Sequence, residues 1–136
     1  EFDAFVAHDF DDFGWIREHL MPKMEGEHHL KLCIGERDFV PGTQLKDVIV
    51  DKIQSSRKTL LLLTPKFVNS EWCDFELAMS RNKLFVNGRD VIVAVVLKPL
   101  QMDTISRRVY NVLKTRLYLE WNDEDVYAQK LFWAKL

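Results

Sequence analysis

KTLLLLT, at positions 58–64, is apolar in almost every position, and VIVAVVL at 91–97 repeats the pattern. A strand with one buried face alternates apolar and polar residues, whereas a strand covered on both faces is apolar throughout. We therefore place both runs at the centre of a parallel sheet. Three further apolar runs predict the remaining strands: FDAFVA at 2–7, LKLCI at 30–34 and TRLYLEW at 115–121.

The segments between these runs have the periodicity of helices. In 44–56, apolar residues recur at the i, i+3, i+4 and i+8 spacing of an amphipathic helix, and Thr43 is placed to cap its start. Strands that alternate with helices predict an α/β fold with a doubly wound parallel sheet and helices on both faces, whose partner surface lies at the carboxyl ends of the strands. Further helices are predicted at 12–25, at 70–83 with Ser70 as its cap, at 101–113 and at 124–136.

Length and charge restrict the class of protein. The chain has 136 residues, 47% of them hydrophobic, which suffices for one domain with a buried core and is too short for two. Its 19 basic and 21 acidic residues give a net charge of -2, which argues against nucleic-acid binding. No apolar run approaches the roughly 20 residues of a membrane-spanning helix. Cys33 and Cys73 lie in apolar or helical surroundings, so we expect reduced thiols.

The segment GERDFVPG, at 35–42, joins a predicted strand to a predicted helix. A phosphate cradle needs closely spaced glycines, whereas six side chains separate Gly35 from Gly42. Pro41 and Gly42 instead suit the two central positions of a type II turn, which would hold the tip in one conformation. The loop is therefore a poor phosphate site and a candidate contact surface.

Two interpretations of the other loop residues are open on chemistry alone. Phe39 and Val40 have no periodicity that would bury them, and Arg37 has the planar fork typical of interface anchors. In the alternative, Phe39 folds back onto the core while Arg37 and Asp38 neutralise each other locally.

The acidic stretch HDFDD at 8–12 follows the first predicted strand. Bacterial receiver domains use paired carboxylates there to hold Mg²⁺, and they also need a phosphate-accepting Asp at the end of the third strand. Thr64-Pro65 stands at that position, and Lys98 does not replace the missing carboxylate. We therefore interpret Asp11 or Asp12 as the cap of the first helix, and we predict no metal site.

SEWCDFEL, at 70–77, places Trp72 and Glu76 at i and i+4 on one helical face. A carboxylate beside an aromatic ring can stabilise an oxocarbenium-like centre. It can equally anchor a neighbouring loop. No Ser-His-Asp or Cys-His arrangement can be assembled from spacing.

Taken together, these motifs resemble a Toll/interleukin-1 receptor (TIR) domain, and most closely one from a Toll-like receptor. FDAFVAHD is similar to the first box of the family, LCIGERDFVPG to the second box with its RD-x-x-PG core, and Phe132-Trp133 to the third. SEWCDFEL and YLEW also resemble the receptor branch. Phe2 stands where the family often has Tyr, and Ala7-His8 where Ser-Tyr is common, which bears on partner preference rather than on fold.

The resemblance implies a single TIR domain over 1–136, with a flavodoxin-like sheet in the strand order 2-1-3-4-5. It implies the cytosolic domain of a single-pass receptor in innate immune signalling, whose partners are other TIR domains in receptor dimers and in adaptor proteins. Contact would be made by the BB loop between the second strand and the second helix. Carried over to this chain, its partner-binding residues are Arg37, Asp38, Phe39, Val40, Pro41 and Gly42.

Some TIR relatives cleave NAD+ with a Glu on the third helix, and Glu76 matches that position. Receptor TIR domains carry a Glu there too and are regarded as scaffolds. The resemblance thus implies a non-enzymatic domain without a cofactor, with NAD+ hydrolysis at Glu76 as the alternative.

Overall fold

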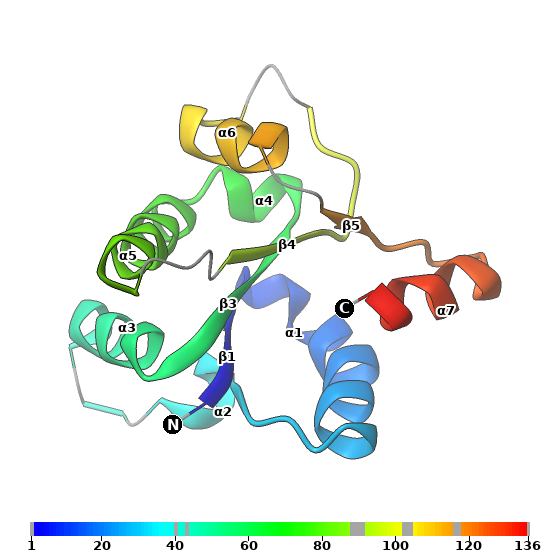
Figure 1. The fold of residues 1–136 in the computed structure, drawn as a ribbon, viewed down its shortest axis with the longest axis horizontal. Coiled ribbons are helices and arrows are strands. Elements are labelled where there is room, and N and C mark those ends of the chain that lie inside the picture. The colour runs from blue at the N-terminus through cyan, green and yellow to red at the C-terminus, as the bar shows by residue number, and fades with distance from the viewer. Residues whose placement is uncertain are drawn as a thin grey trace.

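Figure 1 shows the computed structural model of the chain, which describes residues 2–39, 41–42, 44–87, 92–101, 105–115 and 118–135. Within these ranges, five parallel strands form one sheet in the order β2-β1-β3-β4-β5. The predicted doubly wound, flavodoxin-like sheet is confirmed. The strands are β1 (Phe2–Ala7), β2 (Leu32–Cys33), β3 (Ser56–Leu63), β4 (Ile92–Val96) and β5 (Leu119–Glu120).

Strand β3 occupies the centre of the sheet. It pairs with β1 through Phe5 and Thr59, and with β4 through Leu61 and Ala94. The leucines at 60–63 are all buried, as expected for a strand covered on both faces. The edge strands β2 and β5 are short and lie within the predicted runs 30–34 and 115–121, and a short edge strand offers few unpaired backbone groups to another chain.

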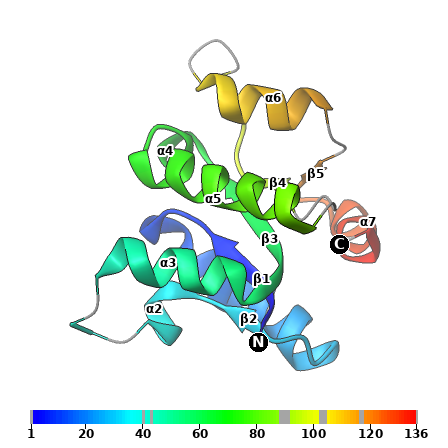
Figure 2. The same ribbon diagram turned by 60° about the vertical axis from the view of Figure 1, so that its left-hand side comes forward.

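Helices cover both faces of the sheet (Figures 1 and 2). One face carries α3 (Leu45–Gln54), α4 (Pro65–Val68), α5 (Glu71–Asn87) and α6 (Arg107–Thr115). The other face carries α1 (Phe13–Trp15), η2 (Ile16–Glu27) and α7 (Val126–Lys135). The short helix α4 was not predicted from the sequence.

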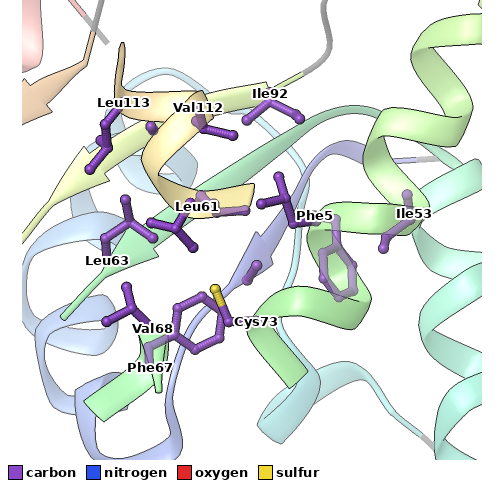
Figure 3. Packing of buried hydrophobic residues seen from close by; sticks show 14 of the residues in the cluster. Phe5, Ile53, Leu61, Leu63, Phe67, Val68, Cys73, Ile92, Val112 and Leu113 are labelled. Atoms are coloured by element: carbon purple, nitrogen blue, oxygen red, sulfur yellow. The ribbon is translucent and has the colours of Figure 1, made fainter. Parts of the chain in front are cut away.

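Each face has its own hydrophobic core. The first joins Ile53 of α3, Leu61 of β3, Cys73 of α5 and Val112 of α6 (Figure 3). Burial of one such aliphatic side chain contributes about 1.5–3 kcal/mol, so packing against the sheet is the main source of helix stability. The second core is aromatic: Trp121 meets Phe132 edge-to-face, with ring centroids 5.1 Å apart.

The first helical region is wound differently from the predicted α-helix at 12–25. It begins with the 3-10 turn η1 (Phe10–Asp12), continues through α1 and becomes the π-helix η2. Pro22 lies inside η2. Because proline has no N–H and its ring collides with the preceding turn, an uninterrupted α-helix is disfavoured at this position.

The prediction that Asp11 or Asp12 caps the first helix is confirmed for position only: Asp12 is the N-cap residue of α1 but makes no side-chain cap bond. The preceding turn η1 is capped by Asp9, whose carboxylate accepts the Asp11 N–H at 3.0 Å. Asp12 is buried and accepts a 2.9 Å hydrogen bond from the Thr64 hydroxyl. Lys98 lies 3.7 Å from the same carboxylate, and Lys66 pairs with Asp11. The acidic stretch therefore ties the ends of β1, β3 and β4 together.

The other caps are partly as predicted. The Cys73 N–H donates to the Ser70 hydroxyl at 3.2 Å, which confirms Ser70 as the cap of α5. Thr43 lies outside the described residues. Gln44 occupies the N-cap position of α3 and makes no side-chain cap bond.

None of the helices in the described part of the chain combines the length and apolarity needed to cross a bilayer. Cys33 and Cys73 are both buried free thiols, as predicted.

Candidate partner-binding loop and adjoining cavity

The base of the 35–42 segment is a single helical turn, α2 (Gly35–Asp38), where the sequence indicated a loop. The N–H groups of Arg37 and Asp38 donate to the Ile34 carbonyl at 3.1 and 2.8 Å, and Phe39 N–H donates to the Gly35 carbonyl at 3.2 Å. The Asp38 carboxylate accepts the Ile34 N–H at 2.8 Å. Backbone and side chain thus fix this turn to the end of β2.

The Arg37 side chain joins α2 to η2. Its guanidinium donates to both Glu25 carboxylate oxygens, at 2.6 and 2.9 Å, and to the Leu32 carbonyl at 2.7 Å. It also donates to both oxygens of Asp38, at 3.1 and 3.0 Å. The hydrogen bonds with Glu25, and then those with Asp38, raise the pKa of Arg37 above its ordinary value. The side chain remains 35% exposed, so the network is open to solvent on one side.

Phe39 is half-buried and turns toward the core. Its ring stacks on Phe5 with centroids 6.4 Å apart and an interplanar angle of 25°. A Cβ placed on Gly35 would lie 3.3 Å from the same ring, so glycine gives the ring room. The positions of Phe39, Arg37 and Asp38 are those of the fold-back alternative. None of the three projects freely.

The tip of the loop has the opposite character. Pro41 and Gly42 are exposed, and Gly42 has φ +91°, as the third residue of a type II turn requires. An added Cβ at Gly42 would meet nothing within 4 Å, so the space beside this glycine is open. Val40 lies outside the described residues.

Beside the loop lies a cavity of about 420 Å³. Trp72 and Glu76 both line it, as the shared helical face predicted, and Glu76 is 7% exposed. Sequence spacing did not show that three distant segments meet here. They are the end of β1 with His8, Asp9 and Phe10, the α2 turn with Gly35 and Phe39, and the helices with Leu45, Ile49, Phe67, Ser70, Trp72 and Glu76.

Two apolar side chains on the rim of this cavity are exposed to solvent. Phe10 is 74% exposed and Leu45 is 45% exposed. Phe10 follows the end of β1 and has only acidic neighbours, and a single apolar residue among acidic ones indicates an exposed side chain. Glu25 carried no such signal, because its stretch EGEHHL has the composition of an ordinary turn.

Comparison with known proteins identifies the family to which this fold belongs. The family described as TIR domain matches residues 1–136. The chain belongs to the TIR domain family. Its second box, RD-x-x-PG, forms the α2 turn and the exposed tip.

The curated relatives of this TIR domain include Toll-like receptors. Toll-like receptor 2 type-2 of Gallus gallus is 37% identical, over 99% of this chain and 18% of the relative. Toll-like receptor 6 of Mus musculus is 34% identical, over 100% of this chain and 17% of the relative. The chain thus spans less than a fifth of these relatives, and it is homologous to their TIR regions.

Solved structures give the same fold. The TIR domain of the Toll-related receptor TRR-2 from Hydra magnipapillata superposes with a TM-score of 0.79 at 24% identity, over 99% of this chain and 94% of that one. A metazoan TIR-STING receptor from C. gigas superposes with a TM-score of 0.69 at 27% identity, over 98% of this chain and 39% of that one.

Proposed function

We propose that this TIR domain is the signalling domain of a Toll-like receptor in innate immunity, and that it binds other TIR domains through the 35–42 loop. The observation that carries the proposal is the contrast within that loop. Pro41 and Gly42 are exposed in a defined turn, while the α2 turn beneath them is bonded to β2 and η2. A tip held in one conformation loses little entropy when it docks.

The partners would be TIR domains of a second receptor and of adaptor proteins. The proposal includes Arg37, Asp38, Phe39, Val40, Pro41 and Gly42 as the partner-binding segment. It also places the domain on the cytosolic side of a membrane, as part of a single-pass receptor.

A contact made by a single loop is small and is expected to be weak, with a dissociation constant of about 1 µM to 1 mM. When an extracellular ligand pairs two receptors, tethering raises the local concentration of the domains to roughly 1 mM. That concentration is sufficient to occupy a contact which is negligible between free domains. Signalling would then follow from proximity, without a reaction in the domain.

The test is the substitution Pro41→His, measured by sedimentation of purified domains fused to a drug-inducible dimerising module. We expect Pro41→His to abolish the TIR–TIR association that the drug induces, and to leave the melting temperature within a few degrees of wild type because Pro41 is exposed. The matched control is Pro65→His, at an exposed proline that opens α4. Association that survives Pro41→His would contradict the proposal, as would equal loss in both variants.

NAD+ hydrolysis is a second candidate, because Glu76 is a buried carboxylate at a cavity large enough for part of a dinucleotide. We favour the scaffold function, since one carboxylate does not define a substrate site. Incubation of the purified domain with NAD+ should release no nicotinamide above the level of Glu76→Ala. Turnover that disappears in Glu76→Ala would establish the enzyme instead.

A further inference from the structure

The outer edge of the sheet beside the loop is closed by side chains. β2 is an edge strand that pairs only with β1 in the sheet. Along a strand, successive residues direct their backbone groups to opposite sides, and Lys31 already accepts from Asp3 of β1. The backbone groups of Leu32 and Ile34 therefore face away from β1.

Three side chains bond those outward groups. The Leu32 carbonyl accepts from Arg37 at 2.7 Å, and the Leu32 N–H donates to Glu25 at 3.4 Å. The Ile34 N–H donates to Asp38 at 2.8 Å. We call Glu25, Arg37 and Asp38 the clasp. It occupies polar groups of an edge strand that would otherwise be available to pair with another chain.

Within the clasp, the Arg37 guanidinium is committed to internal partners. It makes five hydrogen bonds, to Glu25, Asp38 and the Leu32 carbonyl. Both terminal nitrogens and Nε take part, and the pair with Glu25 is bidentate, the geometry that arginine makes strongest. One Nη1 hydrogen has no partner among these five bonds, so a partner carboxylate could accept a single hydrogen bond there, whereas a bidentate pair with this fork would have to displace Glu25 or Asp38.

We propose that Glu25 is a positioning residue of the contact loop. Through Arg37 it fixes the α2 turn to the end of η2 and to the β2 edge, so that Pro41 and Gly42 are presented in a single orientation. Arg37 and Asp38, which belong to the proposed partner-binding segment, then also support the tip from beneath. This inference rests on the proposed binding function, and it assigns a role to a residue outside the RD-x-x-PG motif.

The clasp spans three elements, which is why its loss should affect the loop and not the core. Glu25 lies near the end of η2, and its side chain is 24% exposed. Glutamine has the size of glutamate, so Glu25→Gln opens no cavity, but it removes the charge that pairs with Arg37 and so weakens one support of the α2 turn.

The experiment compares Glu25→Gln and Arg37→Lys with wild type. The matched control is Glu27→Gln, which removes the exposed Glu27–Lys23 pair two residues along the same helix. Association is measured on the dimeriser-fused domain described above. Loop order is measured separately, by hydrogen exchange of the backbone amides at 35–39.

We expect Glu25→Gln and Arg37→Lys each to weaken association by about tenfold and to speed exchange at 35–39 by at least about tenfold. Lysine at position 37 should not replace arginine, because it keeps the charge but lacks the planar guanidinium that bonds Glu25 and Asp38 together. Glu27→Gln should change neither the association nor the rate of exchange. Pro41→His should lose association with exchange at 35–39 unchanged.

The two readouts separate the inference from the proposed function. If wild type does not associate but Glu25→Gln still speeds exchange, the binding function fails while the clasp is confirmed. If Glu25→Gln leaves exchange and association at wild-type values, the clasp is overturned. Equal effects of Glu25→Gln and Glu27→Gln on exchange and association would overturn it as well.

Discussion

The hydroxyl of Thr64 donates a 2.9 Å hydrogen bond to the carboxylate of Asp12, and both side chains are buried. The two residues are 52 positions apart, at the carboxyl ends of β3 and β1. Thr64 also accepts the Phe67 N–H at 3.3 Å and so caps α4. One hydroxyl therefore joins two strand ends to a helix start.

Thr64→Val should lower the free energy of unfolding by about 1–3 kcal/mol, because it removes a hydrogen-bond donor from a buried carboxylate and a cap from a helix. Urea denaturation measures the loss. Thr64→Ser keeps the hydroxyl and should retain most of the stability. Equal stability of Thr64→Val and wild type would show that the bond contributes little.

Phe39→Ala should also destabilise the domain, although Phe39 belongs to the candidate contact loop. Its ring is half-buried between Phe5 and Gly35, so we expect a loss of about 1–3 kcal/mol, below the range for a fully buried Phe. Pro41→His should cost far less, since Pro41 is exposed to solvent. Thermal unfolding of the two variants compares the base and the tip of the loop, and similar losses would mean that the tip is structural.

Gly42→Ala and Gly14→Ala should shift stability in opposite directions. At both glycines a Cβ would meet nothing within 4 Å, so steric contact is the same. At Gly42, φ is +91°, and an alanine there should cost about 1–2 kcal/mol. Gly14 lies in α1, where alanine should add up to about 1 kcal/mol. Chemical denaturation of the matched pair measures the sign of each effect.

The two thiols should be unreactive in the folded domain. Burial raises the pKa of Cys33 and of Cys73 to about 12 from an ordinary 9.0. We expect neither to react with a thiol reagent at pH 8 until denaturant is added. Fast labelling of either thiol without denaturant would contradict its burial.

The same pKa shifts predict how stability depends on pH. Above pH 9 the unfolded chain ionises its thiols while the folded chain keeps them protonated, so stability falls as pH rises from 9 toward 12. Below pH 8 the thiols should add no pH dependence. The variant with Cys33→Ala and Cys73→Ala is the control, and it should show a smaller decline in urea midpoint over that range.

The candidate loop shows where reading the sequence sufficed and where it did not. Pro41 and Gly42 predicted an exposed turn, because proline fixes its own φ and glycine tolerates a positive one. Phe39 could not be placed in the same way. Whether its ring points outward depends on Phe5, which lies 34 positions earlier and stacks on it. The sequence also left three polar roles undecided: the cap at Asp9, the buried acceptor at Asp12 and the pairing of Glu25 with Arg37.

The sequence by itself determined the parallel sheet, the helical layers and the turn at the loop tip, whereas the strand order was implied by the resemblance to the TIR family. These follow from local properties: apolar runs at 58–64 and 91–97 require cover on both faces, and backbone preferences act within a few residues. Only the tertiary structure decided which polar groups meet and which aromatic rings turn inward. A carboxylate such as Glu25 has many chemically equivalent partners in the chain, and packing alone brings one of them within 2.6 Å.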